Sequence, residues 1–318
     1  MMEEVAELVH SVLLPLVEGV PPRFRSAAAA MLALALARCG ADYRPALALV
    51  RSSYLRALVH AELPAYLPGE WRLHLSRALR HAVGLSPSRR CVVLARLAES
   101  ACALNLSPGS YIDAALASAW VCSRGARARL AVALASCGRV EEALGLVGDQ
   151  PAAAVEVAVR APWHPGAVRA GVEAVRRARS WRRRVAMISR LLVGGVTGGA
   201  EPGEVARGLA SVLPLRGTIE DIYLSLVISR NLAEAGWAEL AHGKVEQLLS
   251  TPVPLDALPH WVSELYLQVA YHYAGLPAAL RLAQGAGPMR GYLSASLVEY
   301  ATGLMARGGG GEGVAACG

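Results

Sequence analysis

Arginine is the residue type in this sequence with the clearest capacity for chemistry, because it is abundant and unevenly placed. The chain of 318 residues contains 31 arginines and a single lysine, Lys244. Between residues 160 and 190, nine arginines are opposed by one acidic residue, Glu173, and Trp163 and Trp181 lie among them. Guanidinium groups bind phosphates and aromatic rings stack on bases, so this segment predicts a nucleic-acid-binding surface. Its candidate contact residues are Arg176, Arg177, Arg179, Arg182, Arg183 and Arg184.

A second interpretation of the same segment is structural. The arginines would form a solvated helix face, in which arginine replaces lysine through codon bias, and the two tryptophans would lie in the core. We prefer this interpretation because no recognised nucleic-acid-binding module surrounds the cluster. Charge also varies along the chain, since residues 1–200 hold 25 arginines and 14 acidic residues, whereas residues 201–318 hold 7 basic and 11 acidic residues. We therefore distinguish a basic part, 1–200, from an acidic part, 201–307.

Residues suited to catalysis are few. Lys244 lies in a helical pattern without the leading glycine of a phosphate-binding loop, which argues against kinase, ATPase and Schiff-base chemistry. Glu220 and Asp221 are adjacent, and neighbours on a helix point about 100° apart, so they make a poor general acid–base pair. The glycine-rich segment 194–199 follows no strand and contains no lysine, which favours a flexible connector over an anion site. The sequence thus predicts that the chain is not an enzyme and uses no cofactor.

Histidines and cysteines give no metal-binding pattern. His74 and His81 are two helical turns apart on one face, but no carboxylate or cysteine pattern accompanies them, so we expect no metal site. The six cysteines include no CxxC pair. Cys91 and Cys102 are about three turns apart along one helix axis and cannot bridge each other. We therefore expect free, buried thiols and no intramolecular disulfide.

Helices are the elements that must position these residues. Apolar residues recur at i, i+3, i+4 and i+7 almost throughout, and no segment alternates with a period of two, so the predicted fold class is all-α. A composition that is 54% hydrophobic and 18% charged excludes disorder. Asp42 is predicted to cap a helix that extends through Val59. Helix starts are predicted at Pro68-Gly69, Pro108-Gly109, Pro165-Gly166 and Pro202-Gly203, and helix ends at Gly40, Gly138, Gly236 and Gly275.

Membrane insertion and secretion are not expected from the sequence. The longest run without charged residues, 265–280, contains His272, Gly275 and Pro277, and it is too short and too polar for a membrane span. The N-terminal residues, which include Glu3, have the pattern of an amphipathic helix and not of a secretory signal. We therefore expect a cytoplasmic protein. Its scarcity of amides, with two asparagines and four glutamines, favours a thermophilic source.

One helical hairpin carries a more specific pattern. Within residues 130–144, a helix of small residues meets a tight turn at Gly138, and the next helix places Ala143 at its packing position. This segment resembles a tetratricopeptide-type repeat, whose family pairs two antiparallel helices in each unit of about 34 residues. Gly40 and Gly236 each stand 98 residues from Gly138, near three such units. The resemblance implies antiparallel helical hairpins stacked as an α-solenoid.

This organisation leads to an expectation about function. We predict a single array over residues 1–307, followed by a flexible glycine-rich tail over residues 308–318. Stacked helix pairs leave a concave face built from alternate helices, and such faces bind other macromolecules. We therefore expect a non-enzymatic scaffold or adaptor whose partner is another protein. The alternative is a nucleic-acid-associated protein that binds the phosphate backbone through residues 160–190.

Overall fold

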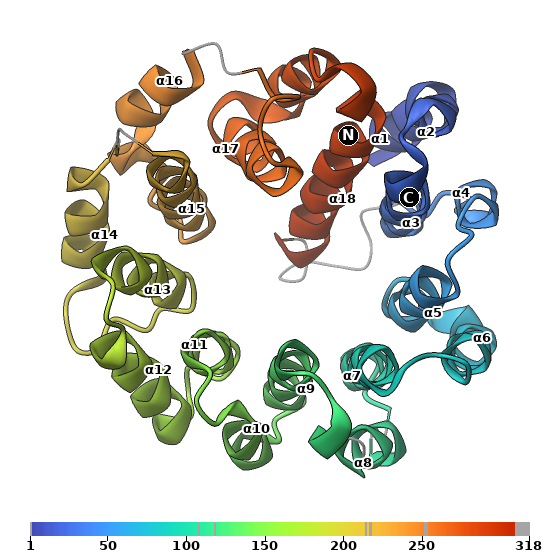
Figure 1. Ribbon diagram of the computed structural model, residues 1–318, viewed down its shortest axis with the longest axis horizontal. Coiled ribbons are helices and arrows are strands. Elements are labelled where there is room, and N and C mark those ends of the chain that lie inside the picture. Colours follow the sequence, from blue (N-terminus) through green and yellow to red (C-terminus); the bar gives the residue numbers. More distant parts are fainter. Residues whose placement is uncertain are drawn as a thin grey trace. The chain divides into compact units, whose positions relative to one another are not determined.

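In the computed structural model of the chain, every regular element among the described residues is a helix (Figure 1). The structure describes residues 2–106, 109–117, 119–213, 215, 218–250 and 254–308. The predicted all-α class is therefore confirmed for that part of the chain. Apart from Gly308, the predicted glycine-rich tail lies outside the described residues. Over the described ranges, no helix combines the length and the apolar character needed to cross a membrane.

The chain divides into two compact units. Unit 1 consists of Met1–Leu85 and Val253–Gly318, and unit 2 consists of Ser86–Pro252. The change of charge at residue 200 falls inside unit 2, so the charge distribution does not follow the packing. The single array over residues 1–307 stays a prediction.

Unit 1 brings the two ends of the sequence together, because α3 (Pro22–Arg38) packs along α18 (Arg290–Gly308), which also packs against α17 (His260–Gln284). The side chain of Arg38 is only 7% exposed, and its Nη1 lies 2.6 Å from Oε1 of Glu299 on α18. The same nitrogen donates to the Glu299 carbonyl at 2.7 Å. A buried guanidinium needs a nearby negative charge, so this contact fixes α3 against α18. The other helices of unit 1 are α1 (Met2–Leu8), η1 (Val9–Leu13), α2 (Leu14–Gly19), α4 (Arg44–Ala48), α5 (Ser53–Glu62), η2 (Leu63–Ala65), η3 (Pro68–Glu70), α6 (Trp71–Ala82) and η6 (Gly287–Met289).

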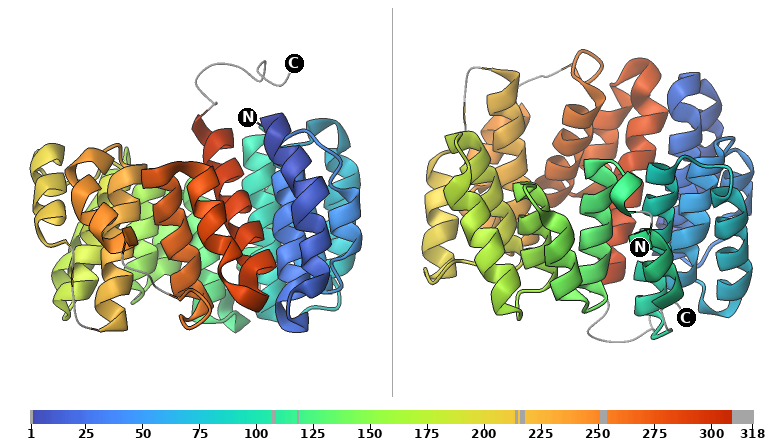
Figure 2. Two further views of the ribbon diagram at one scale, coloured as in Figure 1. Left: turned by 90° about the horizontal axis from the view of Figure 1, so that it is seen from above. Right: turned by 60° about the horizontal axis from the view of Figure 1, so that its bottom comes forward.

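Unit 2 arranges its helices in two rows. The first row consists of α7 (Pro87–Ala103), α9 (Arg124–Ser136), α11 (Pro151–Arg160), α13 (Trp181–Val193) and α15 (Ile219–Glu234), which contact one another in this order. The second row consists of α8 (Gly109–Ala117), α10 (Val140–Val147), α12 (Pro165–Arg177), α14 (Pro202–Ser211) and α16 (His242–Ser250). From α8 to α14, each second-row helix packs against the first-row helix that precedes it. Figures 1 and 2 show these helices standing side by side within unit 2, so a first-row face runs across successive hairpins.

Three of the predicted helix ends share one turn geometry. Gly40, Gly138 and Gly236 have φ angles of +70°, +77° and +82°, a region that side chains with a Cβ disfavour. In each turn, the residue after the glycine donates a hydrogen bond to a carbonyl five residues back, at 2.7 to 2.9 Å. This bond satisfies a carbonyl that the helix end would leave exposed. Helix ends at these three glycines are confirmed.

One local prediction is wrong. The predicted single helix from Asp42 through Val59 is two helices, α4 and α5, because Ser52 adopts an extended backbone and caps α5 by accepting a hydrogen bond from the Leu55 amide. By contrast, the predicted helix end at Gly275 is confirmed, because this residue, with a φ of +80°, separates two helical segments within the range of α17.

The cysteines also differ from the prediction. Cys102, at the end of α7, and Cys137, which caps the end of α9, form a disulfide with their Cα atoms 5.6 Å apart. The expectation that no intramolecular disulfide forms is therefore wrong. The two residues lie 35 positions apart, and only the side-by-side packing of α7 and α9 brings them together. Of the cysteines in the described ranges, Cys39, Cys91 and Cys122 form no disulfide, and the last two are buried.

Candidate functional site

The predicted arginine cluster lies at the junction between α12 and α13. Arg176 and Arg177 end α12, and Arg182, Arg183 and Arg184 fall in the first turn of α13. All these side chains, and that of Arg179 between the helices, are exposed. The structure thus brings all six predicted contact residues to one junction.

Several of these arginines already have partners within the protein. Glu173 lies 2.9 Å from Nε of Arg177, and Asp221 on α15 lies 2.7 Å from Nη2 of Arg182. Nε of Arg184 donates to the Ala178 carbonyl at 2.6 Å, at the C-terminal end of α12. Arg184 therefore joins the start of α13 to the end of α12, and Arg182 joins it to α15, whereas the Arg177 pair lies within α12. The two ion pairs, at Arg177 and Arg182, reduce the positive charge that the cluster can offer to a phosphate backbone.

The tryptophans of this region are not in the core. Trp163 is 66% exposed and Trp181 is 49% exposed, so the preferred structural interpretation is wrong in this respect. The guanidinium carbon of Arg182 lies 5.5 Å from the centre of the Trp181 ring, within the range of a cation–π contact. Both rings could stack on a ligand, and this property keeps the nucleic-acid alternative open.

The residues considered for catalysis have structural roles. Thr218 and Asp221 form a reciprocal cap at the start of α15, and the Thr218 amide and Arg182 hold the pKa of the Asp221 carboxyl below its usual value. Nζ of Lys244 donates to the Ala210 carbonyl at 2.7 Å, near the end of α14. His74 and His81 are not part of any group of three or more His, Cys, Asp and Glu side chains placed to hold a metal, over the residues described.

A groove in unit 2 crosses three successive first-row helices, α7, α9 and α11. Its volume is about 370 Å³. Its apolar surface consists of small side chains, and charged side chains surround them. The apolar residues are Val92, Ala95, Ala128, Val132, Ala152 and Ala153, and the charged residues are Arg96, Glu99, Arg129, Glu156 and Arg160. Small side chains leave the helix surfaces open to a bound segment, and the charged residues can fix its orientation.

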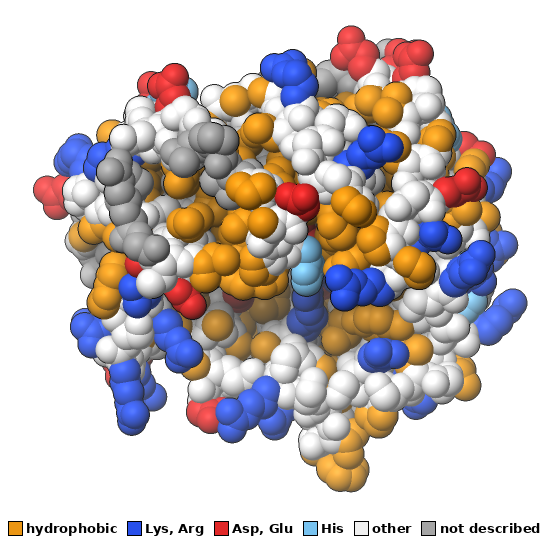
Figure 3. All heavy atoms as spheres, turned by 45° about the horizontal axis from the view of Figure 1, so that its top comes forward, with side chains coloured by type: hydrophobic (Ala, Val, Ile, Leu, Met, Phe, Trp, Pro, Cys, Tyr) orange, Lys and Arg blue, Asp and Glu red, His pale blue; other side chains and the backbone are white. Residues whose placement is uncertain are grey.

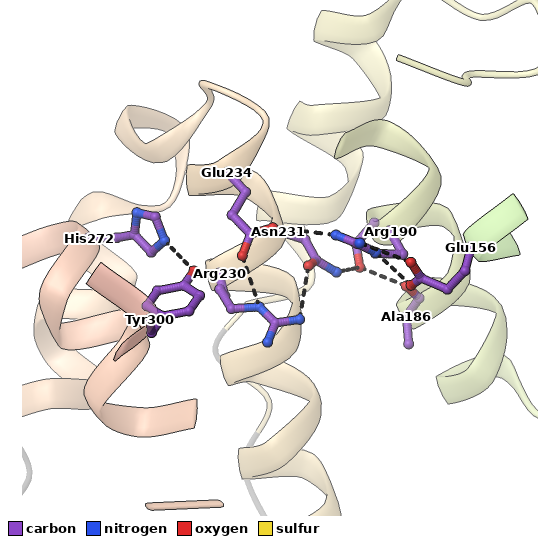
Figure 4. Close-up of polar contacts among 9 residues, drawn as sticks. Glu156, Ala186, Arg190, Arg230, Asn231, Glu234, His272 and Tyr300 are labelled. Atoms are coloured by element: carbon purple, nitrogen blue, oxygen red, sulfur yellow. Dashed lines mark hydrogen bonds and ion pairs between the residues drawn. The ribbon is translucent and has the colours of Figure 1, made fainter. Parts of the chain in front are cut away.

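The acidic residues of this groove are neutralised from within the protein. Arg96 lies 2.7 Å from Glu99 on the same helix. Arg190 of α13 binds both carboxylate oxygens of Glu156, at 2.7 and 2.9 Å, as Figure 4 shows. By contrast, Arg129 and Arg160 form no ion pair with any described residue. The groove therefore presents net positive charge beside an apolar surface.

A polar network continues from the groove along the first row. Arg190 also lies 3.4 Å from Glu234 of α15, which lies 3.5 Å from Arg230. Asn231 donates to the Ser189 hydroxyl at 2.9 Å. Figure 4 shows Arg190 directed toward Asn231 and Glu234 between α13 and α15. Bidentate and shared ion pairs fix side chains more strongly than single exposed pairs. The network therefore holds α11, α13 and α15 in a fixed relation next to the groove.

Sequence reasoning missed this groove, apart from Arg160, which falls in the predicted basic segment. The i, i+3 pairing of Arg96 with Glu99 is visible in the sequence, but the contribution of α9 depends on tertiary packing. On the face shown in Figure 3, basic side chains stand singly or in small groups among hydrophobic and acidic ones.

Comparison with known proteins adds no assignment, since no protein-family model, curated protein or solved structure matches the chain.

Proposed function

We propose that this protein is a non-enzymatic, tetratricopeptide-like α-solenoid scaffold, built from antiparallel helical hairpins, that binds another protein. The observation that supports this function best is the groove across α7, α9 and α11, with its apolar surface and charged surroundings. Repeat proteins use such first-row faces for extended or helical segments of their partners. The proposal places the partner in this groove.

Charge complementarity specifies the chemistry of the partner. Arg129 and Arg160 lack internal ion pairs, whereas the groove carboxylates Glu99 and Glu156 are already neutralised by arginines. The complementary ligand is therefore a protein segment with small apolar side chains and at least two acidic residues. The short side chains of Ala128 and its neighbours set the closeness of approach.

A groove-filling substitution tests this proposal. Ala128→Trp places a large ring in the groove, while Ala114→Trp adds the same ring to an exposed position on α8, outside it. Partners are first captured from an extract of the native organism with and without nuclease, and a captured protein is then purified and titrated. We expect Ala128→Trp to weaken its binding at least about tenfold and Ala114→Trp to leave it unchanged. Equal binding by all three proteins would refute the proposed groove.

Nucleic-acid binding is the second candidate, and the exposed rings of Trp163 and Trp181 favour it. The sharpest test substitutes Arg179 and Arg183 with alanine, because neither forms an ion pair with a described residue. For duplex DNA, each lost phosphate contact should lower the slope of log K against log salt by about 0.9. An unchanged slope, or no binding at low salt, would remove this candidate.

The proposal includes a cytoplasmic location in a thermophilic organism. Disulfides are rare in the cytosol of mesophiles but common in intracellular proteins of hyperthermophiles. The Cys102–Cys137 bridge is compatible with this setting. Recovery of the bridged form from cells lysed under acid quench, in which thiols cannot exchange, tests this part of the proposal.

A further inference from the structure

A pocket in unit 1 collects basic side chains from three helices. It lies between α4, α5 and α6 and has a volume of about 420 Å³. This volume is within the range of small-molecule sites and larger than a single inorganic anion requires. The polar side chains that line it are Tyr43, Arg44, Arg56, His60, Arg77, Arg80 and His81, and the remaining lining residues are Leu47 and Ala48.

The positive charge of this pocket is largely uncompensated. Arg44 lies 3.6 Å from Glu70, the one carboxylate that pairs with a pocket arginine among the described residues. Nε of Arg56 donates to the Val50 carbonyl at 2.5 Å, which orients the guanidinium without neutralising it. Arg77 and Arg80 lie on α6, three residues apart, and therefore on the same side of the helix. Four guanidinium groups and one carboxylate leave three positive charges uncompensated, and a doubly charged anion would offset two of them.

The histidines behind the arginines form an ordered stack. His60 is buried, and its Nδ1 lies 3.0 Å from Nδ1 of His74. The ring of His81 is parallel to that of His60 within 3°, with their centres 5.9 Å apart. Nε2 of His74 lies 3.1 Å from the Tyr43 hydroxyl, which donates to Glu70 at 3.3 Å. One element of this arrangement, the shared face of His74 and His81, is visible in the sequence, whereas His60 joins it through tertiary packing.

The surroundings keep these imidazoles neutral in the free protein. Burial, His74 and the charge of Arg77 lower the pKa of His60 to about 3. Burial and Arg56, Arg80 and Arg77 likewise lower the pKa of His81. A bound anion would add negative charge beside these rings and would raise both values. Histidine titration is therefore a second measure of what occupies the pocket.

We propose that the pocket between α4, α5 and α6 binds a small phosphorylated molecule, with its phosphate held by Arg56, Arg77 and Arg80. A planar guanidinium binds two phosphate oxygens at once, and the three terminal oxygens of a phosphomonoester can accept from several arginines together. The apolar side chains of Leu47 and Ala48 provide a wall for the rest of the ligand. The site lies in unit 1 and the proposed protein-binding groove in unit 2, so each proposal can fail without the other.

The test titrates the full-length protein with inorganic phosphate, a nucleoside monophosphate and a sugar phosphate, by calorimetry at low ionic strength. We expect saturable binding of at least one phosphomonoester that is tighter than binding of phosphate alone. Arg77→Ala with Arg80→Ala should weaken it at least about tenfold, because each lost bond is a charge-assisted one. Arg72→Ala, an exposed arginine on the same helix outside the pocket, should change affinity less than about twofold.

Nuclear magnetic resonance of the histidine rings provides the independent readout. Ligand at saturation should move the titration of His60 and His81 to higher pH in the wild type and not in the double variant. Circular dichroism confirms that the double variant keeps its helices. Absence of saturable binding to every phosphate compound, or binding that the double variant retains in full, would overturn the proposal. Equal affinity for inorganic phosphate and for all the monoesters would show that the pocket recognises phosphate alone. That result would contradict the proposed contact of Leu47 and Ala48 with the rest of the ligand.

Discussion

Breaking the Cys102–Cys137 disulfide should destabilise unit 2 by a predictable amount. The bridge closes a loop over 35 residues of sequence. The chain-entropy relation, in which the loss of entropy grows with the logarithm of loop length, gives about 4 kcal/mol for a loop of this size. For a domain of about 150–250 residues, each kcal/mol shifts the melting temperature by about 2–4 °C. Reduction should therefore lower the melting temperature of unit 2 by about 8–16 °C.

Two measurements check this reasoning. Thiol titration of the denatured, unreduced protein should find four reactive thiols, because two of the six cysteines are bridged. Calorimetry with and without reductant then gives the shift in melting temperature. Cys102→Ser with Cys137→Ser serves as the control, since reductant should have no further effect on it. Six reactive thiols before reduction, or a shift below about 2 °C, would refute the assignment of this bridge as a stabilising contact.

Three further predictions concern packing, turns and pH. Ala143→Phe overfills a fully buried position on α10 and should lower the free energy of unfolding by about 1–3 kcal/mol, with hydrogen exchange rising around residues 110–165. As the control, Ala114→Phe on the exposed surface of α8 should lower it by less than about 0.5 kcal/mol. Arg139, which is close to Ala143 in sequence, is not a suitable control position because it pairs with Glu142 and Asp113. Gly138→Ala places a Cβ on a residue with a φ of +77° and should lower the free energy of unfolding in urea by about 1–2 kcal/mol. Gly145→Ala, inside α10 with open space around it, should instead raise that free energy by up to about 1 kcal/mol. A loss of stability at both positions would contradict the turn geometry. The pKa of His60 falls from 6.5 to about 3 on folding, so between these pH values the unfolded chain binds a proton that the folded chain does not, and stability should decline as pH drops through that window. His60→Asn should reduce the slope of unfolding free energy against pH, between pH 6 and pH 4, by up to about 1.4 kcal/mol per pH unit. An unchanged slope would show that His60 is not neutral when folded.

Local sequence signals predicted the parts of this fold that local chemistry determines. The helix ends at Gly40, Gly138 and Gly236 were accessible because a positive φ favours glycine wherever it occurs. The break between α4 and α5 was not, because Ser52 can occupy either a helix interior or a cap, and tertiary packing selects the cap.

The candidate sites depend on distant residues, and the sequence alone does not place those residues together. The groove combines α7, α9 and α11, and the disulfide joins the ends of two helices that are separated by α8 in sequence. Similarly, the stack beside the basic pocket needs His60 from α5 and His74 from α6. A periodicity argument identifies which face of one helix is buried but not which second helix covers it.

The packing of α3 against α18 has a consequence for synthesis on the ribosome. Unit 2 is a continuous stretch of chain and can fold as soon as it has emerged. Unit 1 cannot, since the apolar side of α3 waits for α18, which is translated after the whole of unit 2. A nascent chain stalled near residue 252 would therefore carry a protease-resistant middle behind an unprotected N-terminal segment. During that interval the N-terminal helices are the part of the protein that depends on chaperones.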